Sequence, residues 1–205
     1  MQTHYPDYDV MNAAEAWDDH TREIVKKRLE SAKHFGKLSF NEAQLVSTAA
    51  EALIDDNRQD LLDFITHHLD QMVVHRIGEG ERKAGTPPQA VLIIQGLAAI
   101  EATAQSQYRT SFTNLSRIQR QTLLGRIERA ELPNSGLWQG IPQPEFFKML
   151  LSLVVEAYYS HPAVWSEIGY GGPAYPRGYV RTELDRIDPW EAKLESGSPH
   201  QRSSD

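Results

Sequence analysis

Residues 143–160 read QPEFFKMLLSLVVEAYYS, and this stretch does most to decide the fold class. Nearly all of its residues are apolar or aromatic, and the polar ones recur every four positions: Lys148, Ser152, Glu156 and Ser160. A four-residue spacing with one narrow polar stripe predicts a helix whose other faces are covered by neighbouring helices or by another chain.

Five more segments carry apolar residues at helical spacing. Helices are expected at about 17–33, 40–54, 59–76, 89–107 and 116–132. Two of these helices begin with a capping-box spacing, Ser39 with Glu42 and Ser116 with Gln119, and the first can be capped by the pair 18–19. No segment alternates apolar and polar residues for more than a few positions, which argues against strands. The sequence therefore predicts an all-α protein, a single-domain bundle of about six helices.

Composition narrows the classes of function. The chain has 205 residues, 40% of them hydrophobic and 24% charged, which is enough apolar material for one sizeable core. With 21 Lys and Arg against 28 Asp and Glu, the formal charge is −7, so no basic face for nucleic acid is expected. No cysteine is present, which excludes disulfides, thiolate-bound metals, iron–sulfur clusters and a thiol nucleophile.

Nothing in the sequence indicates export or a membrane anchor. Residues 1–20 lack the basic start, the apolar stretch and the twin arginines of export signals, so a cytoplasmic protein is expected. The longest unbroken apolar run, 90–94, has five residues, whereas a membrane-spanning helix needs about twenty. No direct insertion into a membrane is therefore expected.

The character of the sequence changes after residue 160. Residues 161–191 contain four prolines, four glycines and five aromatic residues, which leave little room for regular structure beyond a short turn. Aromatic residues are scarce in disordered segments, so 161–192 is expected to be an irregular segment that docks on a partner. The helical domain is expected to span 1–192, with 1–14 as an N-terminal arm and 193–205 as a disordered tail.

No pattern indicates catalytic, cofactor-binding or metal-binding residues in this chain. His68 and His75 share a face of a predicted helix, but no Glu-x-x-His pair accompanies them, and capping or solvated histidines explain them better. The run GYGGP at 169–173 follows no strand and precedes no Gly-Lys-Ser/Thr, so a phosphate loop is not expected. Glu183 and Asp185 lie among arginines, which favours ion pairing over acid–base chemistry.

The C-terminal segment instead concentrates the residue types that dominate binding interfaces. Tryptophan and tyrosine bury large areas, arginine makes multidentate hydrogen bonds, and all three are gathered here. The glycines and prolines are expected to shape the turn that presents them. The residues expected at a partner interface are Trp165, Tyr170, Gly171, Gly172, Pro173, Tyr175, Pro176, Arg177, Tyr179, Arg181, Asp188 and Trp190.

Three other interpretations stay open. The segment can fold back and close the chain's own helical core, with no partner involved. The chain can be a self-contained helical enzyme or small-molecule binder, with a pocket lined by Tyr158, Tyr159, Tyr170 and Tyr175. It can also bury the same surface against a second copy of itself, as a homo-oligomeric structural protein.

The order of residues near the C-terminus carries a family resemblance. Residues 156–191, EAYYSHPAVWSEIGYGGPAYPRGYVRTELDRIDPWE, resemble the signature of the gluconate 2-dehydrogenase subunit 3 family. The likeness covers roughly residues 15–192. Upstream it includes WDDHTR at 17–22, the helical pattern of 40–54, GEG at 78–80 with the prolines at 87–88, and the phenylalanines at 146–147.

The resemblance implies a non-catalytic small subunit. In this family the large partner is a glucose-methanol-choline (GMC) type flavoprotein that holds FAD and oxidises a sugar, polyol or glycoside, sometimes with a cytochrome subunit as electron acceptor. The small subunit wraps the large one, supports its folding as a chaperone, and often carries a twin-arginine signal that exports both. Residues 1–20 show no such signal, so the expected location is cytoplasmic, or periplasmic where the partner carries an export signal. FAD is expected in the partner, and no cofactor in this chain.

Overall fold

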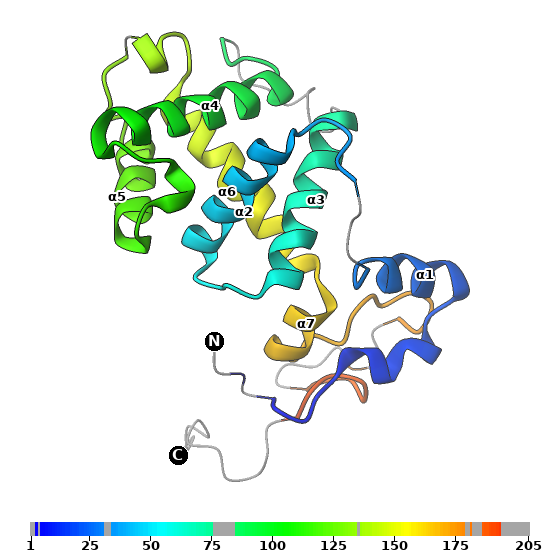
Figure 1. Cartoon of the computed structure of the whole chain (residues 1–205). Coiled ribbons are helices and arrows are strands. Elements are labelled where there is room, and N and C mark those ends of the chain that lie inside the picture. The colour runs from blue at the N-terminus through cyan, green and yellow to red at the C-terminus, as the bar shows by residue number, and fades with distance from the viewer. Residues whose placement is uncertain are drawn as a thin grey trace. The chain divides into compact units, whose positions relative to one another are not determined.

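The computed structural model of the chain (Figure 1) describes residues 3, 5–30, 34–75, 85–134, 136–178, 181 and 186–193, without the side chains of residues 74 and 75. The regular elements in these residues are all helices, which confirms the all-α class. The chain divides into two compact units, a central unit of residues 31–158 and a terminal unit that combines 1–30 with 159–205. The single domain expected over 1–192 stays a prediction.

The central unit contains the five long helices that the apolar spacing predicts. They are α2 (Phe40–Ile54), α3 (Gln59–His75), α4 (Gln89–Tyr108), α5 (Arg117–Glu128) and α6 (Gln143–Ser160), the last of which continues into the terminal unit. Two short 3-10 helices, η3 (Phe112–Asn114) and η4 (Gly136–Trp138), lie in the connections. In Figure 1, α2 and α3 lie side by side, and α2 also contacts α4 and α5.

Capping boxes fix the first residues of two helices, as their spacing predicts. The Ser39 hydroxyl accepts a hydrogen bond from the Glu42 amide at 3.3 Å, and the Ser39 amide donates to the Glu42 carboxylate at 2.8 Å. Ser116 and Gln119 make the same reciprocal pair, with distances of 3.3 and 2.9 Å. Each box satisfies two backbone amides that the first turn of a helix leaves unpaired. The start of α2 and of α5 is therefore encoded locally.

Helix α4 is covered on several sides, as its broad apolar surface predicts. It contacts α2, α3, η3 and η4 within the central unit. It also approaches α6 closely, because a Cβ placed on Gly96 would lie 2.1 Å from two ring carbons of Phe146. The Trp138 indole donates a hydrogen bond to the buried Thr103 hydroxyl at 3.0 Å, which ties η4 to the same helix. Glycine at position 96 is required by this packing and not by its backbone angles.

The exposed stripe of α6 is wider than the sequence indicates. Lys148, Ser152 and Glu156 are exposed, as expected for the polar stripe. Val155 and Tyr159 are exposed beside them, so this helix presents apolar surface that the chain itself does not bury. Whether another chain covers this apolar surface, as the sequence allows, stays a prediction.

One buried carboxylate orders the connection that leads into α2. Asp70 on α3 is fully buried and accepts hydrogen bonds from three consecutive backbone amides, those of Gly36, Lys37 and Leu38, at 2.7 to 2.8 Å. A carboxylate bound by several amides is the usual way to bury a charge without a cationic partner. Asp70 therefore holds residues 36–38 against α3.

The described residues of the terminal unit form three short helical elements. They are the 3-10 helix η1 (Val10–Ala16), α1 (Asp19–Lys27) and α7 (Pro162–Ile168). Asp18 caps α1 as expected, since its carboxylate accepts from the amides of His20 and Thr21 at 3.0 and 3.1 Å. No helix in the described parts of the chain is long and apolar enough to cross a membrane.

Helix α7 corrects the expectation that residues 161–192 are irregular throughout. Its N-cap is His161, whose ring nitrogen accepts from the Ala163 amide at 3.2 Å, and Pro162 occupies its first turn. It ends at Gly169, which has a positive φ of 74°. Proline at the start and glycine just past the end are helix signals that sequence reasoning missed. The expected disordered tail lies outside the described residues except for residue 193.

Replacing Asp70 tests the buried carboxylate. Asp70→Ala is expected to lower the free energy of unfolding by about 2 kcal/mol, because the buried Leu38 amide loses its partner. Asp70→Asn, which keeps one acceptor oxygen, is expected to lose less. Asp60→Ala, at an exposed position in the first turn of the same helix, is the control and should change little. Urea unfolding followed by circular dichroism measures all three, and equal effects of the two alanine variants would contradict this account.

Candidate functional site

The C-terminal segment packs on the N-terminal arm inside the terminal unit. A small hydrophobic core joins Val10 and Ala14 from the arm, and Trp17 just after it, to Val25 of α1 and Trp165 of α7. Backbone contacts support it, since the Val10 amide donates to the Ser166 hydroxyl at 3.1 Å. The part of residues 161–192 that contributes to this core therefore packs on the N-terminal residues of its own chain.

Gly171 and Gly172 permit close packing against two tryptophans in this unit. Gly172 has a φ of 75°, and a Cβ there would lie 2.6 Å from Cζ2 of Trp17. A Cβ on Gly171 would lie 2.7 Å from Cδ1 of Trp190. Both glycines are buried, so the backbone of 171–172 is packed directly against two indole rings. Gly171 and Gly172 were expected to shape the turn. Their lack of a side chain also leaves room for the two indole rings.

Arg177 is held by both of those tryptophans. Its guanidinium carbon lies 4.6 Å from the ring centre of Trp190 and 5.8 Å from that of Trp17. Its Nη2 donates a hydrogen bond to the Gly171 carbonyl, while Nε and Nη1 are buried without a partner among the described residues. Burial lowers the pKa of this guanidinium from its ordinary value. Arg177 therefore links the C-terminal segment to Trp17, mainly through cation–π contacts.

Trp165 differs from the exposed interface anchor that was expected. It is 5% exposed, and its indole nitrogen donates to the Tyr159 carbonyl at 2.6 Å. The Arg28 guanidinium lies 5.4 Å above its ring, and Tyr170 packs edge-on against it at 5.5 Å. Trp165 is thus a core residue of the terminal unit because the arm and α1 cover it, which the sequence of α7 alone does not reveal.

Three further hydrogen bonds order the end of the segment. The Tyr8 hydroxyl donates to the Trp190 carbonyl at 2.7 Å, and burial raises the pKa of this hydroxyl above its ordinary value, so it stays a donor at neutral pH. Asp188 is buried and accepts from the Arg181 amide at 2.7 Å, while its own amide donates to the Glu191 carboxylate at 2.6 Å. Tyr8 was missed by sequence reasoning, because nothing local pairs it with a residue 182 positions away.

The remaining residues of the expected interface are exposed or half-buried. Tyr175 is 69% exposed and is joined to the exposed Pro176 by a cis peptide bond. Tyr170 and Arg181 are exposed, and Pro173 is half-buried. Tyr179 lies outside the described residues. The described interface residues thus separate into an inner group that builds the terminal unit and an outer group that faces solvent.

Seven of the thirteen exposed large apolar side chains in the described residues belong to the terminal unit. Besides Tyr170 and Tyr175, they lie in α1, in the turn after it, at the end of α6 and in the segment: Ile24, Leu29, Tyr159, Ile168 and Ile187. The four tyrosines of the alternative pocket do not share one environment. Tyr158 is buried and donates to Asp56 at 3.4 Å, whereas the other three rings are exposed.

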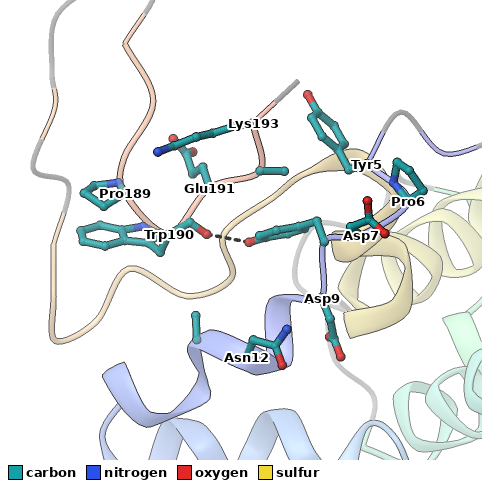
Figure 2. A pocket seen from close by; sticks show the side chains of 12 residues that line it. Tyr5, Pro6, Asp7, Asp9, Asn12, Pro189, Trp190, Glu191 and Lys193 are labelled. Atoms are coloured by element: carbon teal, nitrogen blue, oxygen red, sulfur yellow. Dashed lines mark hydrogen bonds between the residues drawn. The ribbon is translucent and has the colours of Figure 1, made fainter. Parts of the chain in front are cut away.

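A groove of about 470 Å³, here called the arm groove, runs between the N-terminal arm and the end of the segment (Figure 2). In Figure 2, Pro189, Trp190, Glu191 and Lys193 lie on one side, and Tyr5, Pro6, Asp7 and Asp9 lie on the other. Its full lining is Tyr5, Pro6, Asp7, Tyr8, Asp9, Asn12, Ala13, Pro189, Trp190, Glu191, Ala192 and Lys193.

A second groove, of about 390 Å³, adjoins the arm groove. It shares Tyr5, Pro6, Tyr8 and Asp9 with it, and extends past Leu29 to the start of α7. The two grooves therefore flank the same stretch of the arm.

Substituting Gly172 tests the packing of the segment. Gly172→Ala is expected to lower the free energy of unfolding by about 2 to 4 kcal/mol, because the positive φ and the crowding of Trp17 both disfavour a Cβ. Gly178→Ala is the matched control, since its φ of 69° is similar but no atom lies within 4 Å of the added carbon. It should lose only about 1 to 2 kcal/mol. Thermal unfolding followed by tryptophan fluorescence compares the two, and equal losses would exclude the steric role.

Comparison with known proteins places the chain in a family. No curated protein and no solved structure matches it. The family model described as Gluconate 2-dehydrogenase subunit 3 matches residues 41–172, which is more than half of the 205 residues and ends at the glycine packed against Trp17. The chain therefore belongs to the gluconate 2-dehydrogenase subunit 3 family.

Proposed function

We propose that this chain is the non-catalytic small subunit of a flavin-dependent dehydrogenase complex, and that it binds and stabilises a GMC-type large subunit that oxidises a sugar or glycoside. Family membership supports a small subunit of a dehydrogenase complex. In this proposal FAD and the chemistry belong to the large subunit, a cytochrome subunit can take the electrons, and the complex is cytoplasmic unless the partner carries an export signal.

The observation that carries the proposal is the exposed apolar surface of the terminal unit. Tyr175, Tyr170 and Ile168 lie within eight residues of one another in the sequence and all three are exposed. Single exposed apolar residues are ordinary on any protein, but a gathering of them is typical of a binding surface. Tyrosine is also among the residues most enriched at binding hot spots.

The buried contacts behind this surface support a preformed interface. Gly172 against Trp17, and Arg177 against Trp190, hold the backbone on both sides of Tyr175. A segment already ordered by its own chain loses less conformational entropy when it binds, so more of the contact energy appears as affinity. In this way Trp165, Trp17 and Trp190 contribute to binding by positioning the exposed residues.

Stabilisation of the partner follows from mass action. A subunit that binds the folded large subunit, but not its unfolded chain, shifts the folding equilibrium of the large subunit toward the native state. The shift grows with the concentration of the small subunit relative to its dissociation constant. A chaperone-like effect therefore needs no catalytic residue in this chain.

Substitution of exposed side chains tests the proposed interface. Tyr175→Ala combined with Ile168→Ala is expected to weaken binding to the large flavoprotein by at least about fivefold, as loss of a hot spot does. The matched control is Phe40→Ala with Ile118→Ala, which removes an aromatic and an aliphatic side chain that are 72% and 76% exposed in the central unit. The soluble, FAD-loaded yield of the large subunit, expressed alone and with each variant, measures the effect.

Comparison of the wild-type chain with the two double variants separates the possible outcomes. The wild-type chain should raise the FAD-loaded yield, the Tyr175 variant should raise it less, and the Phe40 variant should match the wild type. Equal yields with and without the wild-type chain would refute the proposed function. Equal loss in both double variants would refute the assignment of the interface to the terminal unit. Light scattering of the isolated chain at several concentrations tests the competing homo-oligomer.

A further inference from the structure

The arm groove differs chemically from the exposed apolar surface around Tyr175. Its walls are aromatic and proline side chains, among them Tyr5, Tyr8, Trp190 and Pro189. Its charged lining consists of three carboxylates, Asp7, Asp9 and Glu191, and one ammonium group, Lys193, which gives a net charge of −2. All of these residues lie outside the stretch 41–172 that the family model matches.

The second groove has a similar lining of aromatic and acidic residues. It shares Tyr5, Tyr8 and Asp9 with the arm groove, adds the exposed Leu29, and has Glu167 as its only other charged residue. Together the two grooves are lined by four carboxylates and one ammonium group, a net charge of −3. Because the two grooves are neighbours on either side of the arm, a ligand that fills both must be elongated.

We infer that this pair of grooves takes an extended, basic segment of the large subunit, an inference that rests on the proposed function. Arginine and lysine fit such a lining, since their aliphatic stems can lie along the tyrosine rings while their charged heads reach carboxylates. An extended chain places side chains on both sides of its backbone, and proline-containing chains of this kind dock in aromatic grooves.

The surroundings of the carboxylates show which one is free for a ligand. Asp9 accepts from the Met11 amide at 2.9 Å and caps η1, and Glu191 accepts from the Asp188 amide. Asp7 is exposed, and its carboxylate makes no hydrogen bond or ion pair in the described residues. Substitution of Asp7 should therefore change ligand affinity with the least effect on the fold. Lys193, the one cationic residue of the described lining, allows the opposite change of charge.

Charge reversal at these two positions tests the inference in the full-length chain. The probe is a short fluorescent peptide of alternating arginine and proline, compared with a peptide that has glutamate in place of arginine. Asp7→Lys is expected to weaken binding of the arginine peptide by about fivefold, and Lys193→Glu to strengthen it by a similar factor. Both effects should shrink at high ionic strength, and the glutamate peptide should not bind. Fluorescence anisotropy measures the dissociation constants.

Glu128→Lys is the matched control for net charge. It makes the same change as Asp7→Lys at an exposed position of α5 in the central unit, and should leave the dissociation constant unchanged. If Glu128→Lys weakens binding as much as Asp7→Lys, or if neither groove substitution has an effect, the inference is wrong.

The complex with the large subunit provides the second readout. Asp7→Lys and Lys193→Glu are expected to shift the dissociation constant of the complex in opposite directions. A complex that forms but ignores both substitutions would overturn the groove assignment and leave the proposed function intact. Failure of the wild-type chain to bind the large subunit would overturn the proposed function and, with it, the identity of the occupant. Concentration-dependent dimers that Asp7→Lys disperses would assign the groove to a second copy of the chain instead.

Discussion

The contact between the backbone at Gly172 and the indole of Trp17 is the constraint on which the terminal unit depends. Only glycine accommodates both the positive φ at this position and the short distance to the ring. This contact brings the C-terminal segment against a residue 155 positions earlier in the sequence. Arg177 adds further contacts, because its guanidinium lies over Trp17 and Trp190. Without the contact between Gly172 and Trp17, the segment after α7 would lose its closest packing on the N-terminal residues.

This constraint divides the aromatic residues of the segment between two roles. Trp165 and Trp190 contribute to the terminal unit itself, whereas Tyr170 and Tyr175 remain exposed on the same stretch of chain. The interpretation that the segment closes the chain's own fold and the interpretation that it binds a partner are therefore compatible. The buried Trp165 and the half-buried Trp190 order the backbone, and an ordered backbone presents the exposed rings at a low entropic cost.

In the proposed complex, the terminal unit offers two surfaces of different character to the large subunit. The exposed apolar residues gain free energy through burial, which depends little on salt. The acidic grooves act mainly through electrostatic complementarity, which favours particular partners and orientations and weakens with ionic strength. In the proposed complex, such a combination gives the small subunit its specificity for the large one.

The sequence by itself determined the helices and their beginnings. The four-residue spacing in 143–160 and the boxes at Ser39 and Ser116 act within one or two turns, so local physics is enough to predict them. The helix after His161 was predictable by the same local rules, from Pro162 and Gly169, although it was taken for irregular structure. Only the tertiary structure decided that Trp165 is buried, that Tyr8 bonds to Trp190, and that two chain ends enclose an acidic groove. These features join residues more than one hundred positions apart, and no periodicity or local motif records which distant residues will meet.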